Sequence, residues 1–294
     1  MTIKNIGDYN GMHRNTLTSK GKITEILSRC KAILFNFIDV KKKIILFKIW
    51  NNIKLPTKKE VIIITDGPSF NKKMAEKIFL YKNHFDILAM NNYFLNDCSK
   101  ELIPDYYLLS DFQYVETQSV KKKEINKGLY KYILNTDIKL LLPYGKIWKV
   151  LRTPYVKFND SQNLSSNNID PRKPRGYRGN TSFKAIALML AMKYSKIYIV
   201  GFDYDYPRKI TLDMNNKLFL KDDHSYGEKG LPINLDCSTE FDSVAHAMHW
   251  WAQDYWHLKK LNSPKVINVT KDSMIDVFSR ITPDDFIDYM ENVQ

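Results

Sequence analysis

The stretch from Arg178 to Asp203 constrains the fold of this chain more than any other part of it. It contains, in order, a loop, a helix N-cap near Thr181, an amphipathic helix, and a buried strand that ends in Gly-Phe-Asp. In α/β proteins a ligand lies at the carboxyl ends of parallel strands, beside helix N-termini whose free N–H groups favour anions. The stretch therefore predicts an enzyme or a binder of a nucleotide or another phosphate compound.

Other segments of the chain repeat this strand-and-polar-turn pattern. The β-branched run 61–64 is typical of a buried parallel strand, and its turn Thr65-Asp66-Gly67-Pro68-Ser69 leads into a predicted helix over 72–81. Further strands are predicted over 86–90, 106–109, 139–142 and 266–270, and helices over 238–261 and from Thr282 onward. Because strands alternate with helices, we expect residues 59–294 to form one α/β domain with a doubly wound parallel sheet.

The first 58 residues differ from this domain in composition. A polar tail over 1–20 precedes the segment 23–54, in which apolar and aromatic residues recur at helical spacing among lysines. This basic amphipathic helical extension has two interpretations. It lies in a membrane interface, or it packs on the body of the domain with its lysines solvated.

Charge and cysteine content limit the class of protein. The net charge of +13 indicates an anionic partner, but no nucleic-acid-binding module is visible, so we expect no nucleic-acid partner. The three cysteines, Cys30, Cys98 and Cys237, have no paired spacing, which favours a reducing compartment over a disulfide scaffold or a zinc site. With no apolar leader and no run of about 20 apolar residues, the chain is expected to be cytoplasmic.

His224 is the best candidate for a general base. It lies in a polar loop, flanked by two carboxylates and two hydroxyls. An adjacent aspartate can hold the imidazole in one tautomer and raise its pKa, which suits proton transfer near neutral pH. The histidines of the 238–261 helix lack a third metal ligand, so they are interpreted as core or surface residues; these are His246, His249 and His257.

A second group of candidates surrounds the start of the helix near Ser182. Asn180, Thr181 and Ser182 are the expected cap, and Arg178 suits bidentate contact with a phosphate. Aspartates offer an alternative, a magnesium site for phosphoryl transfer. They are Asp66, Asp203, Asp205, Asp222 and Asp223. The chain has neither a Walker lysine motif nor GxGxxG, which disfavours the common NTPase and dinucleotide-binding classes.

Five segments together resemble the bacterial sialyltransferases of glycosyltransferase family 42, which decorate lipooligosaccharides and capsules. They are 61–69 (VIIITDGPS), 90–94 (MNNYF), 178–182 (RGNTS), 196–203 (KIYIVGFD) and 224–227 (HSYG). The same segments resemble the wider superfamily of MptE-like proteins, named for a pterin pyrophosphokinase. The resemblance implies a Rossmann-like fold of the GT-A-variant kind.

The resemblance also implies roles for individual residues. The turn Asp66, Gly67, Pro68 and Ser69 would bind the CMP moiety of the donor, with Asn91 near its phosphate and ribose. The third-strand position falls at Ser110 or Asp111, and the positions before the central helix fall at Arg178 and Thr181. The catalytic base would be His224. Two tyrosines that stabilise the departing phosphate have their nearest equivalents in Tyr204 and Tyr206, which flank Asp205.

The implied reaction is a single inverting displacement, without a metal, from CMP-sialic acid to a glycan or glycolipid acceptor at the inner membrane face. Asp66 and Asp205 depart from the family, since they replace an amide and a phenol; a carboxylate near a phosphate is repelled unless a cation offsets it. The donor sugar could therefore be another nonulosonic acid or Kdo. Two alternatives stay open, a magnesium-dependent pyrophosphokinase and a non-catalytic nucleotide-sugar binder of a glycan assembly cluster. The sequence does not decide whether the chain forms a homo-oligomer.

Overall fold

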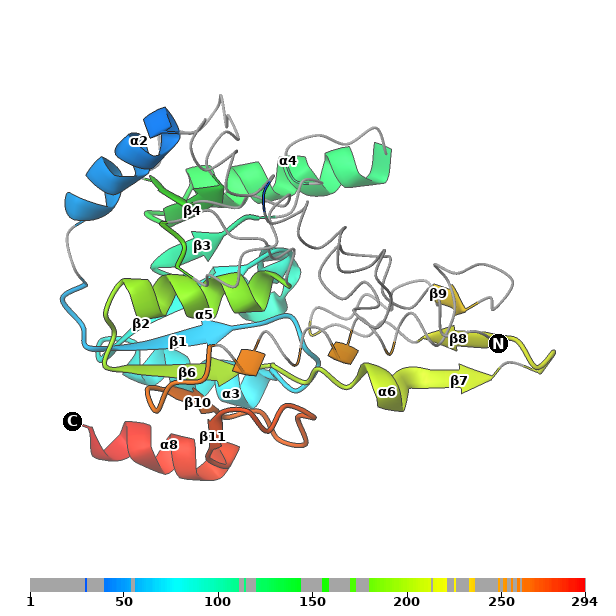
Figure 1. Ribbon diagram of the computed structural model, residues 1–294. Coiled ribbons are helices and arrows are strands. Elements are labelled where there is room, and N and C mark those ends of the chain that lie inside the picture. Colours follow the sequence, from blue (N-terminus) through cyan, green and yellow to red (C-terminus); the bar gives the residue numbers. More distant parts are fainter. Residues whose placement is uncertain are drawn as a thin grey trace.

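Eight parallel strands form the central sheet of the computed structural model, in the order β11-β10-β6-β1-β2-β3-β4-β5 (Figure 1). Their bounds are β1 Glu60–Ile64, β2 Phe85–Met90, β3 Tyr106–Leu108, β4 Lys139–Pro143, β5 Tyr155–Phe158, β6 Lys196–Val200, β10 Val266–Asn268 and β11 Ser279–Arg280. The structure describes residues 30, 40–53, 56–110, 114, 120–143, 155–158, 170–172, 180–212, 214–220, 225, 233–235, 248, 251–252, 255, 258–259 and 261–293.

Helices cover both faces of this sheet. They are α2 Val40–Asn51, α3 Lys72–Tyr81, α4 Val120–Leu134, α5 Thr181–Ala191 and α8 Pro283–Asn292, with short 3-10 helices η1 Tyr93–Leu95 and η2 Asp97–Lys100. The one-turn helix α6 Tyr206–Lys209 lies beyond the carboxyl end of β6, next to β7 (Figure 1). Side chains of β1 alternate between two hydrophobic cores because successive strand residues point to opposite faces. Val61 and Ile63 pack with α5, whereas Ile62 and Ile64 pack with α3 and α8. The predicted doubly wound Rossmann-like sheet is confirmed.

The sequence located most of these elements to within a residue or two. The predicted helix over 72–81 is α3, and its N-cap is Asn71, whose side-chain oxygen accepts a hydrogen bond from the Met74 amide at 3.0 Å. The predicted C-terminal helix is α8, which begins with a capping box between Thr282 and Asp285. In the predicted 238–261 helix, the described residues 248, 251–252, 255 and 258–259 are helical, and Leu261 lies in a turn, so the helix ends before the predicted boundary.

The region after β6 differs from the expectation. The sequence indicated only a polar excursion there, but the chain forms α6 and then a separate antiparallel sheet in the order β7-β8-β9. Its strands are β7 Ile210–Leu212, β8 Leu218–Leu220 and β9 Ile233–Leu235. Figure 1 shows this small sheet projecting beyond the carboxyl end of the parallel sheet. Strands of three residues carry too little periodicity to be recognised in a sequence.

Helix α2 lies against β5 (Figure 1). Leu46 is fully buried and Trp50 is 8% exposed, and Trp50 belongs to the core that α5 also covers. This part of the extension therefore packs on the domain, while its opposite side carries exposed Ile44 and Phe47. The division at residue 58 stays a prediction. Among the helices that the structure describes, none is both long and apolar enough to cross a membrane.

Candidate functional site

The candidate site lies where the order of the strands reverses. From β1 the chain proceeds outward to β2, β3, β4 and β5, and then returns to place β6 on the other side of β1. In open α/β sheets, ligands bind in the crevice outside the carboxyl ends of the two strands at such a switch point. The turns that follow β1 and β6 are therefore the expected walls of a site.

Two glycines bring these turns into direct contact. The Gly67 amide donates to the Gly201 carbonyl at 3.0 Å, and a Cβ added to Gly67 would lie 2.1 Å from that oxygen. Gly201 has a φ of +73°, in the left-handed region that favours glycine. The predicted importance of the Gly67 turn thus has a steric basis, since a side chain there would separate β1 from the β6 turn.

Asp203 and Ser69 join the same two turns through their side chains. The Ser69 hydroxyl donates to Asp203 Oδ2 at 2.8 Å, and the Ser69 amide donates to the same oxygen at 3.3 Å. Burial raises the pKa of the Asp203 carboxyl, and the hydrogen bonds from Ser69 act in the opposite direction. Both residues were candidates from the sequence, and the structure brings them together.

A cavity of about 190 Å³ lies between the β1 and β6 turns and the start of α5. Nine of the residues that line it were candidate site residues from the sequence: Asp66, Gly67, Pro68, Asn91, Asn180, Ser182, Asp203, Tyr204 and Asp205. Asn91 has a φ of +51°, and its buried Oδ1 has no hydrogen-bond partner among the described residues. An unmet buried acceptor costs about 1–3 kcal/mol. A ligand O–H or N–H would supply the missing donor.

Asp205 is paired with a lysine that the sequence interpretation missed. Lys209 Nζ lies 3.1 Å from Asp205 Oδ1, four residues away, and the two side chains are 14% and 24% exposed. Lys209 also lines the cavity. The pair supplies the cation needed to offset Asp205 near a phosphate. Spacing of i, i+4 was visible in the sequence, but it becomes informative only once α6 is recognised.

A second missed lysine lies beside the neighbouring strand end. Lys184, in the first turns of α5, is 5% exposed, and its Nζ donates to the Ser110 hydroxyl at 3.3 Å. Ser110 in turn shares a hydrogen bond of 3.1 Å with Thr181. The Asn180 side chain caps α5 by accepting from the Ser182 amide at 3.1 Å, as predicted. Of these residues, Asn180 and Ser182 line the cavity, so the N-terminus of α5 forms one edge of the site.

The two candidate tyrosines lie on either side of Asp205, before and at the start of α6. Tyr204 is 7% exposed and packs with Phe183 and Phe202, each at 5.7 Å between ring centroids, and it also borders the 190 Å³ cavity. Its backbone carbonyl accepts from Trp251 Nε1 at 3.3 Å. Tyr206 begins α6. The roles assigned to both stay predictions.

Arg178, Asp111 and the candidate base His224 lie outside the described residues. Ser225, the residue after His224 in the sequence, is described. Its amide donates to the Asp66 carbonyl at 2.8 Å, and Asn96 Nδ2 donates to its hydroxyl at 3.3 Å. The motif that contains His224 therefore contacts the predicted CMP-binding turn through its neighbour.

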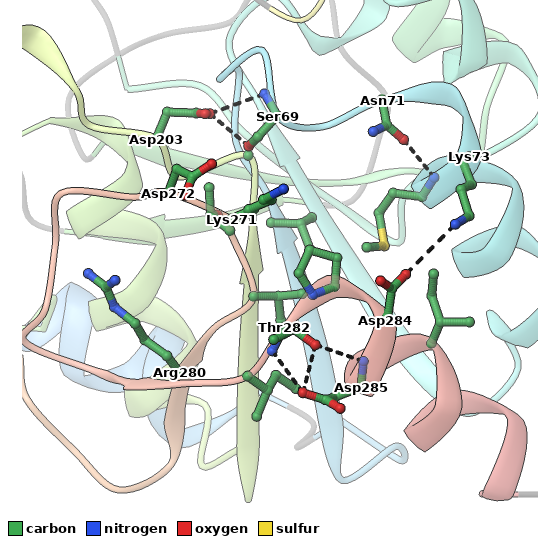
Figure 2. A pocket seen from close by; sticks show the side chains of 18 residues that line it. Ser69, Asn71, Lys73, Asp203, Lys271, Asp272, Arg280, Thr282, Asp284 and Asp285 are labelled. Atoms are coloured by element: carbon green, nitrogen blue, oxygen red, sulfur yellow. Dashed lines mark hydrogen bonds and ion pairs between the residues drawn. The ribbon is translucent and has the colours of Figure 1, made fainter. Parts of the chain in front are cut away.

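A larger cavity, of about 880 Å³, adjoins the first on the side of β10, β11 and α8. The two cavities share Gly201 and Asp203 as lining residues. Figure 2 shows Ser69 and Asp203 at one side of the larger cavity and the side chains of Lys73 and Asp284 at another. No function was predicted from the sequence for the residues after β10 and β11.

The described residues contain no group of three His, Cys, Asp or Glu side chains arranged for a metal ion. Asp203 and Asp205, two of the candidates for magnesium, are instead engaged with Ser69 and Lys209. The expectation that the protein acts without a metal stays a prediction.

Comparisons with known proteins give one structural likeness. No protein-family model matches the chain, and no curated protein sequence matches it. The chain is similar to the structure titled MAf glycosyltransferase from Magnetospirillum magneticum AMB-1, with a TM-score of 0.48 and 11% sequence identity. The match covers 85% of this chain and 41% of that one, so this chain spans less than half of its neighbour.

Proposed function

We propose that this protein is a glycosyltransferase that moves sialic acid, or a related nonulosonic acid or Kdo, from a CMP-activated donor to an acceptor hydroxyl. The observation that carries the proposal is the switch-point cavity, where the Gly67 turn, Asn91 and the N-terminus of α5 meet. These are the positions that the family resemblance assigns to donor binding. The choice of CMP as the nucleotide rests on that resemblance alone.

The dimensions of the site indicate how a donor would lie in it. The cavity of about 190 Å³ is smaller than the roughly 300–1,000 Å³ of most small-molecule sites. A nucleotide sugar would therefore extend beyond it, along the carboxyl ends of β2 and β3. There it would meet the Ser110–Thr181–Lys184 group, whose cation and hydroxyls suit a phosphate.

In the proposed mechanism, His224 takes the proton from the acceptor hydroxyl as its oxygen attacks the anomeric carbon. The bond from that carbon to the phosphate oxygen breaks, and CMP departs. Arg178, Tyr204 and Tyr206 would neutralise the charge that grows on the phosphate. The contact of Ser225 with Asp66 supports the role of His224, and the ion pair of Lys209 with Asp205 removes one objection to a phosphate there.

The experiment that tests this function offers the purified protein CMP-Neu5Ac, CMP-Kdo and ATP, each with and without EDTA, and measures released CMP or AMP. The expected result is CMP release that survives EDTA and is lost in His224→Ala. Magnesium-dependent AMP release, with the CMP-sugars untouched, would instead establish the pyrophosphokinase alternative. Tight nucleotide binding without turnover, unaffected by His224→Ala, would indicate a non-catalytic binder.

A further inference from the structure

The larger cavity has a lining unlike that of the donor site. Its floor is apolar, formed by Met74, Val200, Val269 and Ile287, each at most 8% exposed. Its rim carries charges of both signs, with Lys73, Lys271 and Arg280 opposed by Asp203, Asp272, Asp284 and Asp285. In a chain of net charge +13, this rim has no excess of cations. A polyanion would be poorly accommodated there.

Several of the polar groups are already engaged. Arg280 donates to the backbone carbonyls of Ser273 and Ile275, and Asp285 is held in the capping box with Thr282. The carboxylate of Asp285 thus occupies the N-terminus of α8, which disfavours a bound phosphate. Lys73 and Asp284 form only an exposed pair at 3.7 Å (Figure 2). Exposed Lys271 and Asp272 complete the accessible rim.

We propose that this cavity binds the acceptor, as an uncharged saccharide. A sugar ring has apolar C–H faces and a rim of hydroxyls, which match an apolar floor and a rim of donors and acceptors of both charges. The cavity shares Gly201 and Asp203 with the donor site, so a bound saccharide would adjoin the donor site on the side of β6 and β10. This inference rests on the proposed function for its role as acceptor, but not for saccharide binding itself.

Two surface lysines allow a matched comparison. Lys73 lines the cavity, whereas its neighbour Lys72 points elsewhere on α3, is 86% exposed and lies 3.8 Å from Glu76. The test variant is Lys73→Ala/Lys271→Ala, and the control is Lys72→Ala. Saturation-transfer NMR on the full chain would measure binding of p-nitrophenyl glycosides of galactose, glucose, mannose and N-acetylglucosamine. Inorganic phosphate serves as the anionic probe, and its binding is measured by displacement of the glycosides and by ³¹P line broadening.

We expect at least one glycoside to bind, with affinity lowered about ten-fold in the double variant and unchanged in the control. Acceptor-dependent CMP release should show the same rise in acceptor KM, while acceptor-independent CMP release stays unchanged. No glycoside binding, binding unaffected by the double variant, or preferential binding of phosphate would overturn the assignment. Saccharide binding without turnover of any CMP-sugar would refute the proposed function and leave the saccharide site standing.

A second inference rests on α2, which carries a basic and apolar outer face. Ile44 is 50% exposed and Phe47 is 66% exposed, next to exposed Lys48. Tyr155, on the strand against which α2 lies, is 53% exposed. The helix contains four lysines and no acidic residue. Exposed apolar side chains beside a lysine can enter the interface of an anionic membrane while the lysine stays among the headgroups.

We infer that this α2 face, defined by Ile44, Phe47 and Lys48, docks on an anionic phospholipid bilayer. The observation that selects a bilayer is charge complementarity, since both the helix and the whole chain are basic. Trp50 and Leu46 anchor the opposite side of the helix in the domain, so docking requires no unfolding. The membrane contact predicted for residues 23–54 is thereby narrowed to a defined surface.

The test is co-sedimentation of the full chain with vesicles of phosphatidylglycerol and phosphatidylcholine, or of phosphatidylcholine alone. Binding should require phosphatidylglycerol and fall at least ten-fold in Ile44→Ser/Phe47→Ser. The matched control is Leu80→Ser on α3, whose side chain is 64% exposed. Binding that is independent of the anionic lipid, or equal in the double variant, would overturn the inference. So would light scattering that shows a dimer lost in the double variant and no vesicle binding, because the face would then bind a second copy.

Discussion

Replacing Gly67 with alanine tests the steric basis of the candidate site. The new Cβ would lie 2.1 Å from the Gly201 carbonyl oxygen and 1.9 Å from Asp203 Oδ2, where ordinary contacts begin at 3.4 Å. The Asp203 side chain can rotate, but the carbonyl belongs to the backbone. The β1 and β6 turns must therefore move apart by more than 1 Å.

The expected cost follows from the contacts that this movement breaks. Overpacking of this kind costs about 1–3 kcal/mol, and loss of the hydrogen bond from Gly67 to Gly201 adds about 1 kcal/mol. We expect Gly67→Ala to lower the free energy of unfolding by about 3 kcal/mol. At roughly 2–4 °C per kcal/mol, the melting temperature should fall by about 6–12 °C. Donor turnover should fall about 100-fold, because a displacement of about 1 Å disrupts positioning.

Urea unfolding, thermal melting and CMP release measure these changes, and Gly128→Ala is the matched control. Gly128 is an exposed residue within α4, and a Cβ there would meet only Phe94 Cε2, at 3.2 Å. Alanine in a helix interior gains about 0.5–1 kcal/mol over glycine, so the control should be neutral or slightly stabilising. An unfolding free energy for Gly67→Ala within 1 kcal/mol of the parent chain would refute the argument.

Three further predictions concern single interactions. Ser69→Ala should raise the pKa of Asp203 further, because it removes a hydroxyl donor to the carboxylate. Carboxyl ¹³C NMR measures the pKa, and Ser69→Thr should restore the original value; an unchanged pKa in Ser69→Ala would contradict the role of this hydrogen bond. Lys209→Met should raise the KM for the donor about ten-fold, because it leaves the Asp205 carboxylate unpaired. The double variant Lys209→Met/Asp205→Asn should restore most of the affinity for the donor. A KM that stays raised in the double variant would contradict the unpaired charge as the cause. Burial raises the pKa of Asp86, so the folded state binds this proton more tightly than the unfolded chain does. The protein therefore loses stability as the pH rises above 3.8 and the unfolded chain releases the proton first. Urea unfolding should show Asp86→Asn gaining stability relative to the parent chain as the pH rises, and a constant difference would argue against burial as the cause.

The sequence predicted the parallel sheet because its strands are buried on both faces. The run 61–64 has no polar residue to mark an exposed side, and its polar turn identified the carboxyl end where the site lies. The start of α8 followed from its cap residue Thr282, which the structure shows in use. For α3 the sequence suggested the serine of the preceding turn as the cap, whereas the structure uses Asn71. These features are local, so they can be read without knowing the fold.

What the sequence could not give depends on distant contacts. From the sequence alone, Lys184 and Lys209 would be taken for solvent-exposed lysines. The packing of α5 and α6 shows instead that both side chains are largely buried beside polar partners. The larger cavity combines residues from the β1, β6, β10 and β11 turns, which no single motif connects. The short strands β7, β8 and β9 are defined by their hydrogen bonds to one another, and the composition of each three-residue segment does not indicate a strand.

The central position of β1 has a consequence for synthesis of the chain. β1 lies between β2 and β6 in the sheet. The Thr65 hydroxyl at its end donates a hydrogen bond to the carbonyl of Val200, which lies 135 residues later in the chain. At about 5–20 residues per second, a ribosome needs roughly 7–27 seconds to make the intervening chain. During that time the edge of β1 that pairs with β6 in the folded protein has no native partner strand. We therefore expect the nascent chain to depend on a chaperone, or to aggregate when translation stalls before β6 emerges.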